Sequence, residues 1–279
     1  MNALRAPAPA RRQAADASPR AHEPPGDGTQ VLRRAASILK TIAAATPLGL
    51  TLAEVSRAQA LPKSTVHRIL RCLNEEGLVE RPAGSLRYHT GQLAYELGLS
   101  VTRSTLDLSR WRRAVDAVAE RTGVTTYLMR RSGLEAVCLM KAEGRAVVRV
   151  IPVEVGQRRL LGVGAGATAL LAAVDEPNAE QMLKLIVPAL KDYPRITEAG
   201  LREAVGEARR EGVAISRGKV MPYSFGMGMA IAQAPGEPLL AISIAAHLNS
   251  VSDADVAQWR RVLREEIAQA LTRQRQGVV

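Results

Sequence analysis

Cysteine is scarce in this chain of 279 residues, which contains only Cys72 and Cys138. Neither residue belongs to a CxxC motif or to a cluster of cysteine and histidine, so the sequence predicts neither a disulfide framework nor a structural zinc site. A reducing compartment, the cytoplasm, is the expected location, and no metal or cofactor is expected.

Long apolar runs are missing as well. Nowhere do about 18 apolar residues follow one another, the length that suits a membrane-spanning helix, and the N-terminus carries no apolar run typical of a signal peptide. We therefore expect a soluble protein without a membrane partner.

Histidine is equally sparse, with His22, His67, His89 and His247 scattered along the chain. None is paired with another potential ligand at i+3 or i+4, and none has a nucleophile-like turn such as GxSxG nearby. The sequence therefore shows no catalytic constellation, and we do not expect an enzyme. A catalytic C-terminal domain stays as a rival interpretation, which turnover of a bound acid would reveal.

The small-residue run 162–168 invites comparison with nucleotide-binding loops. It lacks the Gly-Lys-Ser/Thr ending of a P-loop, and no acidic residue follows at the distance typical of a dinucleotide fold. An anion or small polar ligand held by backbone N–H groups at a helix start is the favoured interpretation.

Positive charge is abundant, with a formal net charge of +11. Residues 31–91 carry nine lysines and arginines against four glutamates, so much of the excess lies in a short part of the chain. This balance indicates a polyanionic partner.

Part of this positive charge lies in the stretch 61–73, which reads as a helix. Val66, Ile69, Leu70 and Leu73 fall at i, i+3, i+4 and i+7, which predicts one buried helix face, while polar and basic residues occupy the other faces. Pro62 suits the start of this helix, where Ser64 or Thr65 can cap backbone donors.

A short helix capped by Thr51 precedes it, and residues 59–61 form the turn between the two helices. Gly77 suits a left-handed helix end, and residues 78–88 read as a β-hairpin. Two helices, a tight turn and a basic hairpin predict a winged helix-turn-helix, whose second helix enters the DNA major groove.

Two kinds of DNA contact are expected from this unit. Phosphates are assigned to Lys63, Arg68, Arg71 and the wing residue Arg87, and base edges to Ser64, Thr65 and His67. A protein-interaction module that uses the winged helix for docking stays as a second rival.

The rest of the chain divides into further units. Residues 1–28, rich in Ala, Pro and Arg, are expected to be a disordered tail, 29–91 the DNA-binding domain, 92–122 a helical linker, and 123–279 the C-terminal domain. Strands are expected at 124–130, 135–141, 146–151, 213–216, 226–233 and 239–246. Helices are expected at 31–42, 92–99, 108–123, 165–174, 178–191, 197–211 and 253–273. Hairpin-linked strands with inserted helices favour an α+β domain on an antiparallel sheet.

Over residues 29–275 the chain resembles the IclR family of bacterial transcription regulators. The stretch Leu61–Leu70 is similar to the family's recognition-helix signature, and residues 162–174, 212–216 and 241–245 resemble its effector domain. The resemblance implies an N-terminal winged helix-turn-helix joined by a helical linker to a GAF-like effector-binding domain. It also implies a homodimer or homotetramer on double-stranded promoter DNA, and a small-molecule effector.

The resemblance further implies an effector site. Its expected residues are Ala165, Gly166, Ser216, Gly226, Met227, Ser243 and Ala245. Here Ser216 replaces an acidic residue, Gly226 replaces a cysteine and Ala245 replaces a small polar residue that are common in the family. With Phe225, Met227 and Met229 nearby, a less polar site is expected, which suits a bulkier or partly aromatic carboxylic acid.

Overall fold

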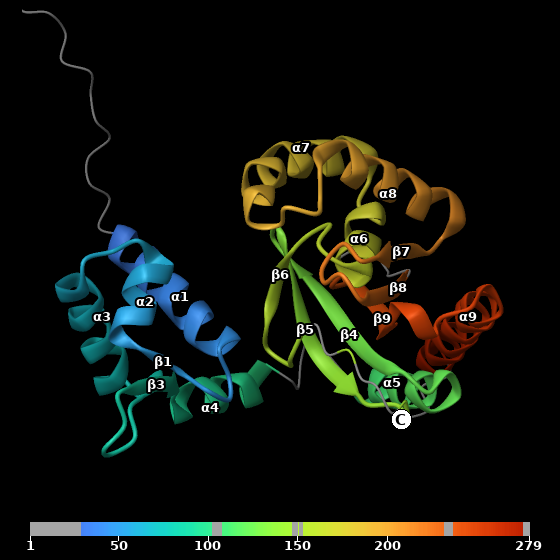
Figure 1. The fold of residues 1–279 in the computed structure, drawn as a ribbon. Coiled ribbons are helices and arrows are strands. Elements are labelled where there is room, and N and C mark those ends of the chain that lie inside the picture. The colour runs from blue at the N-terminus through green and yellow to red at the C-terminus, as the bar shows by residue number, and fades with distance from the viewer. Residues whose placement is uncertain (1–28, 102–107, 147–149, 151–152, 232–236, 276–279) are drawn as a thin grey trace, which may run out of the picture.

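The structure, a computed structural model, describes residues 29–101, 108–146, 150, 153–231 and 237–275 (Figure 1). The expected tail at 1–28 lies outside the described residues, as does most of the strand expected at 146–151. The end of the strand expected at 226–233 also lies outside them.

Three helices and a small sheet make the N-terminal unit. The helices are α1 (Thr29–Ala44), α2 (Leu52–Gln59) and α3 (Lys63–Glu75). The strands are β1 (Leu50–Thr51), β2 (Val79–Glu80) and β3 (Arg87–Thr90), arranged β1-β3-β2 and antiparallel. The predicted hairpin is thus confirmed, and β1 is a third strand that the sequence did not predict because two residues carry no alternating pattern.

The apolar stripe of α3 is confirmed as the buried face of this unit. Val66, Ile69, Leu70 and Leu73 are all buried, and they pack with Ile38 and other residues of α1. The helix ends before Gly77, which adopts the left-handed conformation at φ +70°. Its N-terminus carries no side-chain cap, so the capping predicted for Ser64 or Thr65 is wrong.

Two helices follow the winged unit. They are α4 (Gln92–Val101) and α5 (Ser109–Thr122), and α5 ends at Gly123 with φ +74°. The Arg121 guanidinium of α5 donates to the carboxylates of Glu265 and Glu266 at 2.5 and 2.6 Å. Those two glutamates belong to the last helix of the structure, so these ion pairs join α5 to that helix.

A six-stranded antiparallel sheet forms the C-terminal unit. Its order is β6 (Arg158–Leu160), β5 (Glu135–Ala142), β4 (Thr125–Ser132), β9 (Leu240–His247), β8 (Ser224–Ile231) and β7 (Ala214–Arg217). The α+β architecture with an antiparallel sheet is confirmed. Strand β6 lies at an edge and was not predicted.

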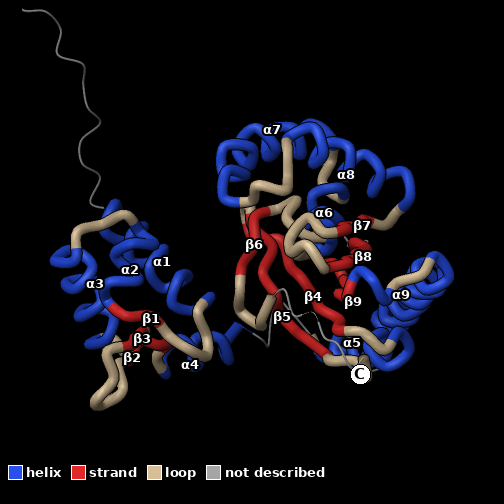
Figure 2. Tube along the Cα trace, in the orientation of Figure 1, coloured by secondary structure: helices blue, strands red, loops and turns tan. Residues whose placement is uncertain are grey.

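Helices cover both faces of this sheet (Figures 1 and 2). On one face lie α6 (Ala165–Ala172), α7 (Glu176–Ile186), the short 3-10 helix η1 (Val187–Asp192) and α8 (Glu198–Glu211). On the other lie α5 and α9 (Asp253–Arg275), and a second 3-10 helix, η2 (Leu248–Ser250), follows β9. Each face therefore has its own apolar core.

Strand alternation decides which core each residue of β8 joins. Phe225, Met227 and Met229 pack in the core beside α5 and α9, so the residues between them face α6. In the described part of the chain, no helix combines the length and the apolar character needed to cross a membrane.

Candidate functional site

The outer face of α3 is polar and basic. Lys63, Ser64, His67, Arg68 and Arg71 are all exposed on it, whereas Thr65 is partly buried. Arg71 also forms an i,i+4 ion pair with Glu75 at 3.5 Å, with both side chains mostly in solvent. An exposed pair of this kind contributes little to stability, so it leaves Arg71 available to an anionic partner.

The wing residue Arg87 has partners within the protein. Its guanidinium donates to the carbonyl oxygen of Gly49 at 3.0 Å and to the Glu54 carboxylate at 3.2 Å. These contacts hold the hairpin against the start of α2. The side chain is still 45% exposed, so a phosphate can reach it only in competition with Glu54.

Glu54 forms a capping box at the start of α2. Its carboxylate accepts hydrogen bonds from the backbone N–H and the hydroxyl of Thr51 at 2.8 and 2.9 Å, while the Thr51 hydroxyl accepts from the Glu54 N–H. The bond from the Thr51 backbone, aided by its hydroxyl and by Arg87, lowers the pKa of Glu54. This network joins the start of α2 to the wing.

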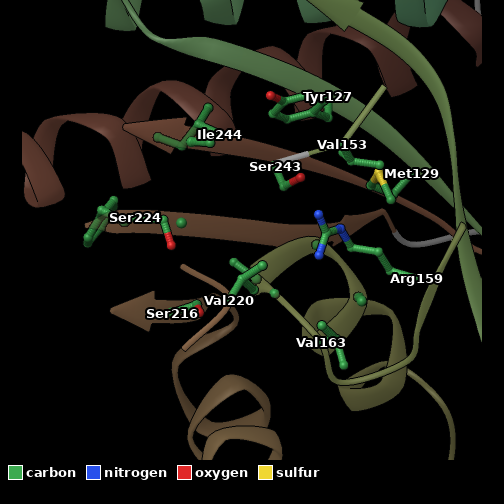
Figure 3. Close-up of a pocket in the computed structure, with 17 residues that line it drawn as sticks. Tyr127, Met129, Val153, Arg159, Val163, Ser216, Val220, Ser224, Ser243 and Ile244 are labelled. Atoms are coloured by element: carbon green, nitrogen blue, oxygen red, sulfur yellow. The ribbon is translucent and has the colours of Figure 1, made fainter. Parts of the chain in front are cut away.

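The C-terminal unit contains a cavity between α6 and the sheet (Figure 3). Its volume is about 60 Å³, and it is partly open to solvent. Its lining residues are Tyr127, Met129, Val153, Arg159, Val163, Gly164, Ala165, Gly166, Ala167, Ser216, Val220, Ser224, Phe225, Gly226, Ser243, Ile244 and Ala245.

The first turn of α6 forms one wall. Gly164 precedes the helix and offers no side-chain cap, and the amides of Ala165, Gly166 and Ala167 make no hydrogen bond to any described residue. Since the first N–H groups of a helix have no partner within it, they remain donors for an acceptor in the cavity.

Two glycines let this turn lie close to the sheet. A Cβ on Gly166 would meet the Ser243 hydroxyl oxygen at 2.7 Å, and one on Gly228 would meet the Ala165 carbonyl group at the same distance. The close contact of helix and strand therefore depends on the missing side chains.

Arg159 is a lining residue that the sequence analysis missed. It lies on the three-residue strand β6, and Figure 3 shows its guanidinium pointing toward the middle of the cavity. Burial lowers the pKa of Arg159. A short strand beginning with two arginines gives no periodic signal, so the pattern could not distinguish this side chain from a solvated one.

Most of the expected effector residues come together here. Ala165, Gly166, Ser216, Gly226, Ser243 and Ala245 all line the cavity. Met227 does not, and its expected place in the site is corrected: it is fully buried in the core on the other face of the sheet.

The lining is mainly apolar, with a few hydroxyl groups. Tyr127 donates a long hydrogen bond of 3.5 Å to the carbonyl oxygen of Val150, and burial strongly raises the pKa of this phenol. The volume of about 60 Å³ is small beside that of an engineered cavity that binds benzene, which measures about 150 Å³.

A second hollow, of about 410 Å³, lies between α8 and β7. Ser216 lines both spaces, but Glu203, Glu207, Arg217 and Lys219 make the second one more polar. Among the described residues, no three His, Cys, Asp or Glu side chains gather as metal ligands would.

Comparison with known proteins gives matches along most of the chain. The model of the IclR helix-turn-helix domain matches residues 31–83, and the model described as bacterial transcriptional regulator IclR C-terminal matches residues 101–273. The transcriptional regulator BhcR of Paracoccus denitrificans is 28% identical over 228 residues, covering 81% of each chain.

Solved structures share the fold. An IclR transcriptional regulator from Alicyclobacillus acidocaldarius is 25% identical, with a TM-score of 0.70 over 86% of this chain and 97% of its own. An IclR homologue from Microbacterium hydrocarbonoxydans, solved with 4-hydroxybenzoate, is 23% identical, with a TM-score of 0.66 over 88% and 99%.

Proposed function

The chain belongs to the IclR family of bacterial transcriptional regulators, and we propose that it binds promoter DNA through α3 and senses a carboxylic acid at the amino end of α6. It is an effector-responsive regulator of transcription and not an enzyme, as the names of its relatives indicate. The observation that carries the DNA-binding role is the exposed basic face of α3, which lies opposite the buried stripe.

We assign two roles on that face. Lys63, Arg68 and Arg71 hold phosphates, and this neutralisation makes the affinity fall as salt rises. Ser64 and His67, which are exposed near the start of the helix, lie nearest the bases, with Thr65 beside them. Arg87 contributes a phosphate contact from the wing when it leaves Glu54.

We propose a homodimer or homotetramer in the cytoplasm as the working state. A two-fold assembly places two recognition helices on the two halves of a palindromic operator. Exposed apolar side chains on α4, namely Tyr95, Leu97 and Leu99, support a contact between subunits there. Sedimentation velocity at micromolar concentration tests this assembly, and a monomer alone would contradict it.

The effector we propose is a short-chain carboxylic acid, in place of the bulkier or partly aromatic acid that we expected from the sequence. Its carboxylate suits the unpaired amides of α6, and the volume of about 60 Å³ suits a short chain better than a ring. Calorimetric titration with acetate, propionate, butanoate, benzoate and 4-hydroxybenzoate tests the class. Tighter binding of 4-hydroxybenzoate than of propionate would show that the cavity walls move and that the volume argument fails.

DNA binding is tested by fluorescence anisotropy. The promoter beside the protein's own gene is compared with scrambled DNA over a series of salt concentrations. We expect tight binding to the promoter that weakens with salt. Equal and weak binding to both DNAs, repeated in a genome-wide site selection, would refute the proposed function.

A further inference from the structure

Two neighbouring arginines on β6 have different surroundings. The Arg158 guanidinium donates to the carboxylate of Glu135 at 2.8 Å and to the Ser132 hydroxyl at 3.4 Å. Arg159 lines the cavity and makes no hydrogen bond or ion pair with any residue of the described part of the chain. The two side chains point to opposite sides of the strand, and of the two only Arg158 has a partner among the residues that the structure describes.

An unpaired guanidinium in a partly buried place is unfavourable. Leaving water removes hydrogen bonds from the cation, and no acidic group among the described residues replaces them. Burial shifts the pKa of Arg159 below its ordinary value, but arginine stays protonated in proteins. Arg159 therefore brings to the cavity a positive charge that no acidic side chain of the described residues pairs.

The other walls strengthen this field. None of the described residues that line the cavity is an aspartate or a glutamate. The amides of Ala165, Gly166 and Ala167 present the positive end of a helix to the same space. The guanidinium and the helix start thus favour the same kind of occupant, one that has an anionic head and accepts several hydrogen bonds.

We infer that Arg159 selects the effector's charge, holding a carboxylate in the cavity and discriminating against the uncharged amide of the same shape. The inference rests on the proposed function, because it assigns a residue to the effector cavity. Residues elsewhere in the wall set the size of the chain, whereas Arg159 sets the requirement for an anion.

Each acid of the panel has a matched amide, such as propionamide for propionate. We expect the wild type to bind an acid more tightly than its amide by about 10-fold to 150-fold, the usual range for one hydrogen bond to a charged group. In Arg159→Gln the preference for the acid falls about tenfold, since glutamine cannot form a charge-assisted pair and only the amides of α6 still favour the anion. Arg159→Lys keeps part of the preference, because lysine retains the charge without the planar fork.

Arg158→Gln is the matched control. It removes a charge one residue away, and we expect it to keep the acid preference of the wild type. Circular dichroism melting checks that each variant folds. The inference is overturned if the wild type binds amides as well as acids, if it binds no acid, or if Arg159→Gln keeps its preference.

Promoter binding is measured on the same preparations, which separates the two ideas. Salt-dependent promoter binding with no acid preference would support the proposed DNA-binding function and refute the role of Arg159. An acid preference that depends on Arg159, without any promoter binding, would refute the proposed function and keep the inference.

Discussion

The contact between α6 and β8 can be tested by adding one methyl group. In Gly228→Ala the new Cβ would lie 2.7 Å from the carbonyl carbon and oxygen of Ala165 and 2.8 Å from the nitrogen of Gly166. These are backbone atoms of the first turn of α6, so no flexible side chain can move aside. The turn must shift away from the strand, and it carries the amides that face the cavity.

The expected magnitude follows from two opposing effects. Replacing a strand glycine by alanine without strain stabilises a protein by about 0.4 to 1 kcal/mol, because the unfolded chain loses freedom. Overpacking of a core costs about 1 to 3 kcal/mol. We therefore expect a net loss of about 1 to 2 kcal/mol for Gly228→Ala, with weaker binding of the acid.

Gly226→Ala is the matched control on the same strand. Its Cβ would lie 3.3 Å from the Ala165 Cβ, a contact that needs a shift of a few tenths of an ångström. We expect the two effects to cancel within about 0.5 kcal/mol.

Differential scanning calorimetry measures both variants. For a unit of this size, each kcal/mol moves the melting temperature by about 2 to 4 °C. Gly228→Ala should melt several degrees below Gly226→Ala, while promoter binding without effector stays intact. Equal melting temperatures would refute the close contact and would place the first turn of α6 farther from the sheet.

Three further predictions concern DNA, acid and charge. Arg71→Ala should weaken all DNA sequences alike and reduce the salt slope by about 0.9 for the one phosphate that the variant leaves without a cation, whereas Thr65→Ala should cost about 1 to 3 kcal/mol at one operator position in anisotropy titrations. Stability should fall on acidification. Hydrogen bonds lower the pKa of Glu54, Asp175, Glu180 and Asp255 in the folded state. Their contribution is complete above the unfolded values of 3.8 to 4.5 and is lost as the pH falls through the lower folded values, so melting temperatures should be constant from about pH 7 to 5 and then drop. Ser216→Asp puts a carboxylate into the cavity that Arg159 lines, and calorimetry should show at least about tenfold weaker binding of the acid.

Most of the helices could be predicted from the sequence. The stripe of α3 appears because Val66, Ile69, Leu70 and Leu73 repeat at helical spacing. The helices expected at 197–211 and 253–273 correspond to α8 and α9. Gly77 and Gly123 indicated helix ends, since glycine adopts the left-handed conformation easily. These signals are local, so a sequence can display them.

Features that depend on tertiary pairing were missed. Strand β1 exists because Leu50 and Thr51 pair with Tyr88 and Arg87, and nothing near residue 50 indicates this partner. Arg159 was missed for the same reason, because its strand β6 forms by pairing with β5, where Arg159 lies opposite Ala136. Two adjacent arginines read as a solvated stretch until the sheet places one of them over a cavity.

The prediction that Met227 lines the effector site was wrong for a different reason, because the strand pattern itself contained the needed information. Side chains alternate along a strand, so the Met227 side chain points away from the face on which Gly226 and Gly228 lie against α6. The alternation gives β8 two tasks: Gly226 and Gly228 allow α6 to lie close, while Met227 and Met229 fill the core that α5 and α9 share. Packed cores resist continuous deformation, so a shift of the first turn of α6 that moves β8 must also repack Met227. One face of β8 thus forms a wall of the cavity, and its other face packs in the core against α5.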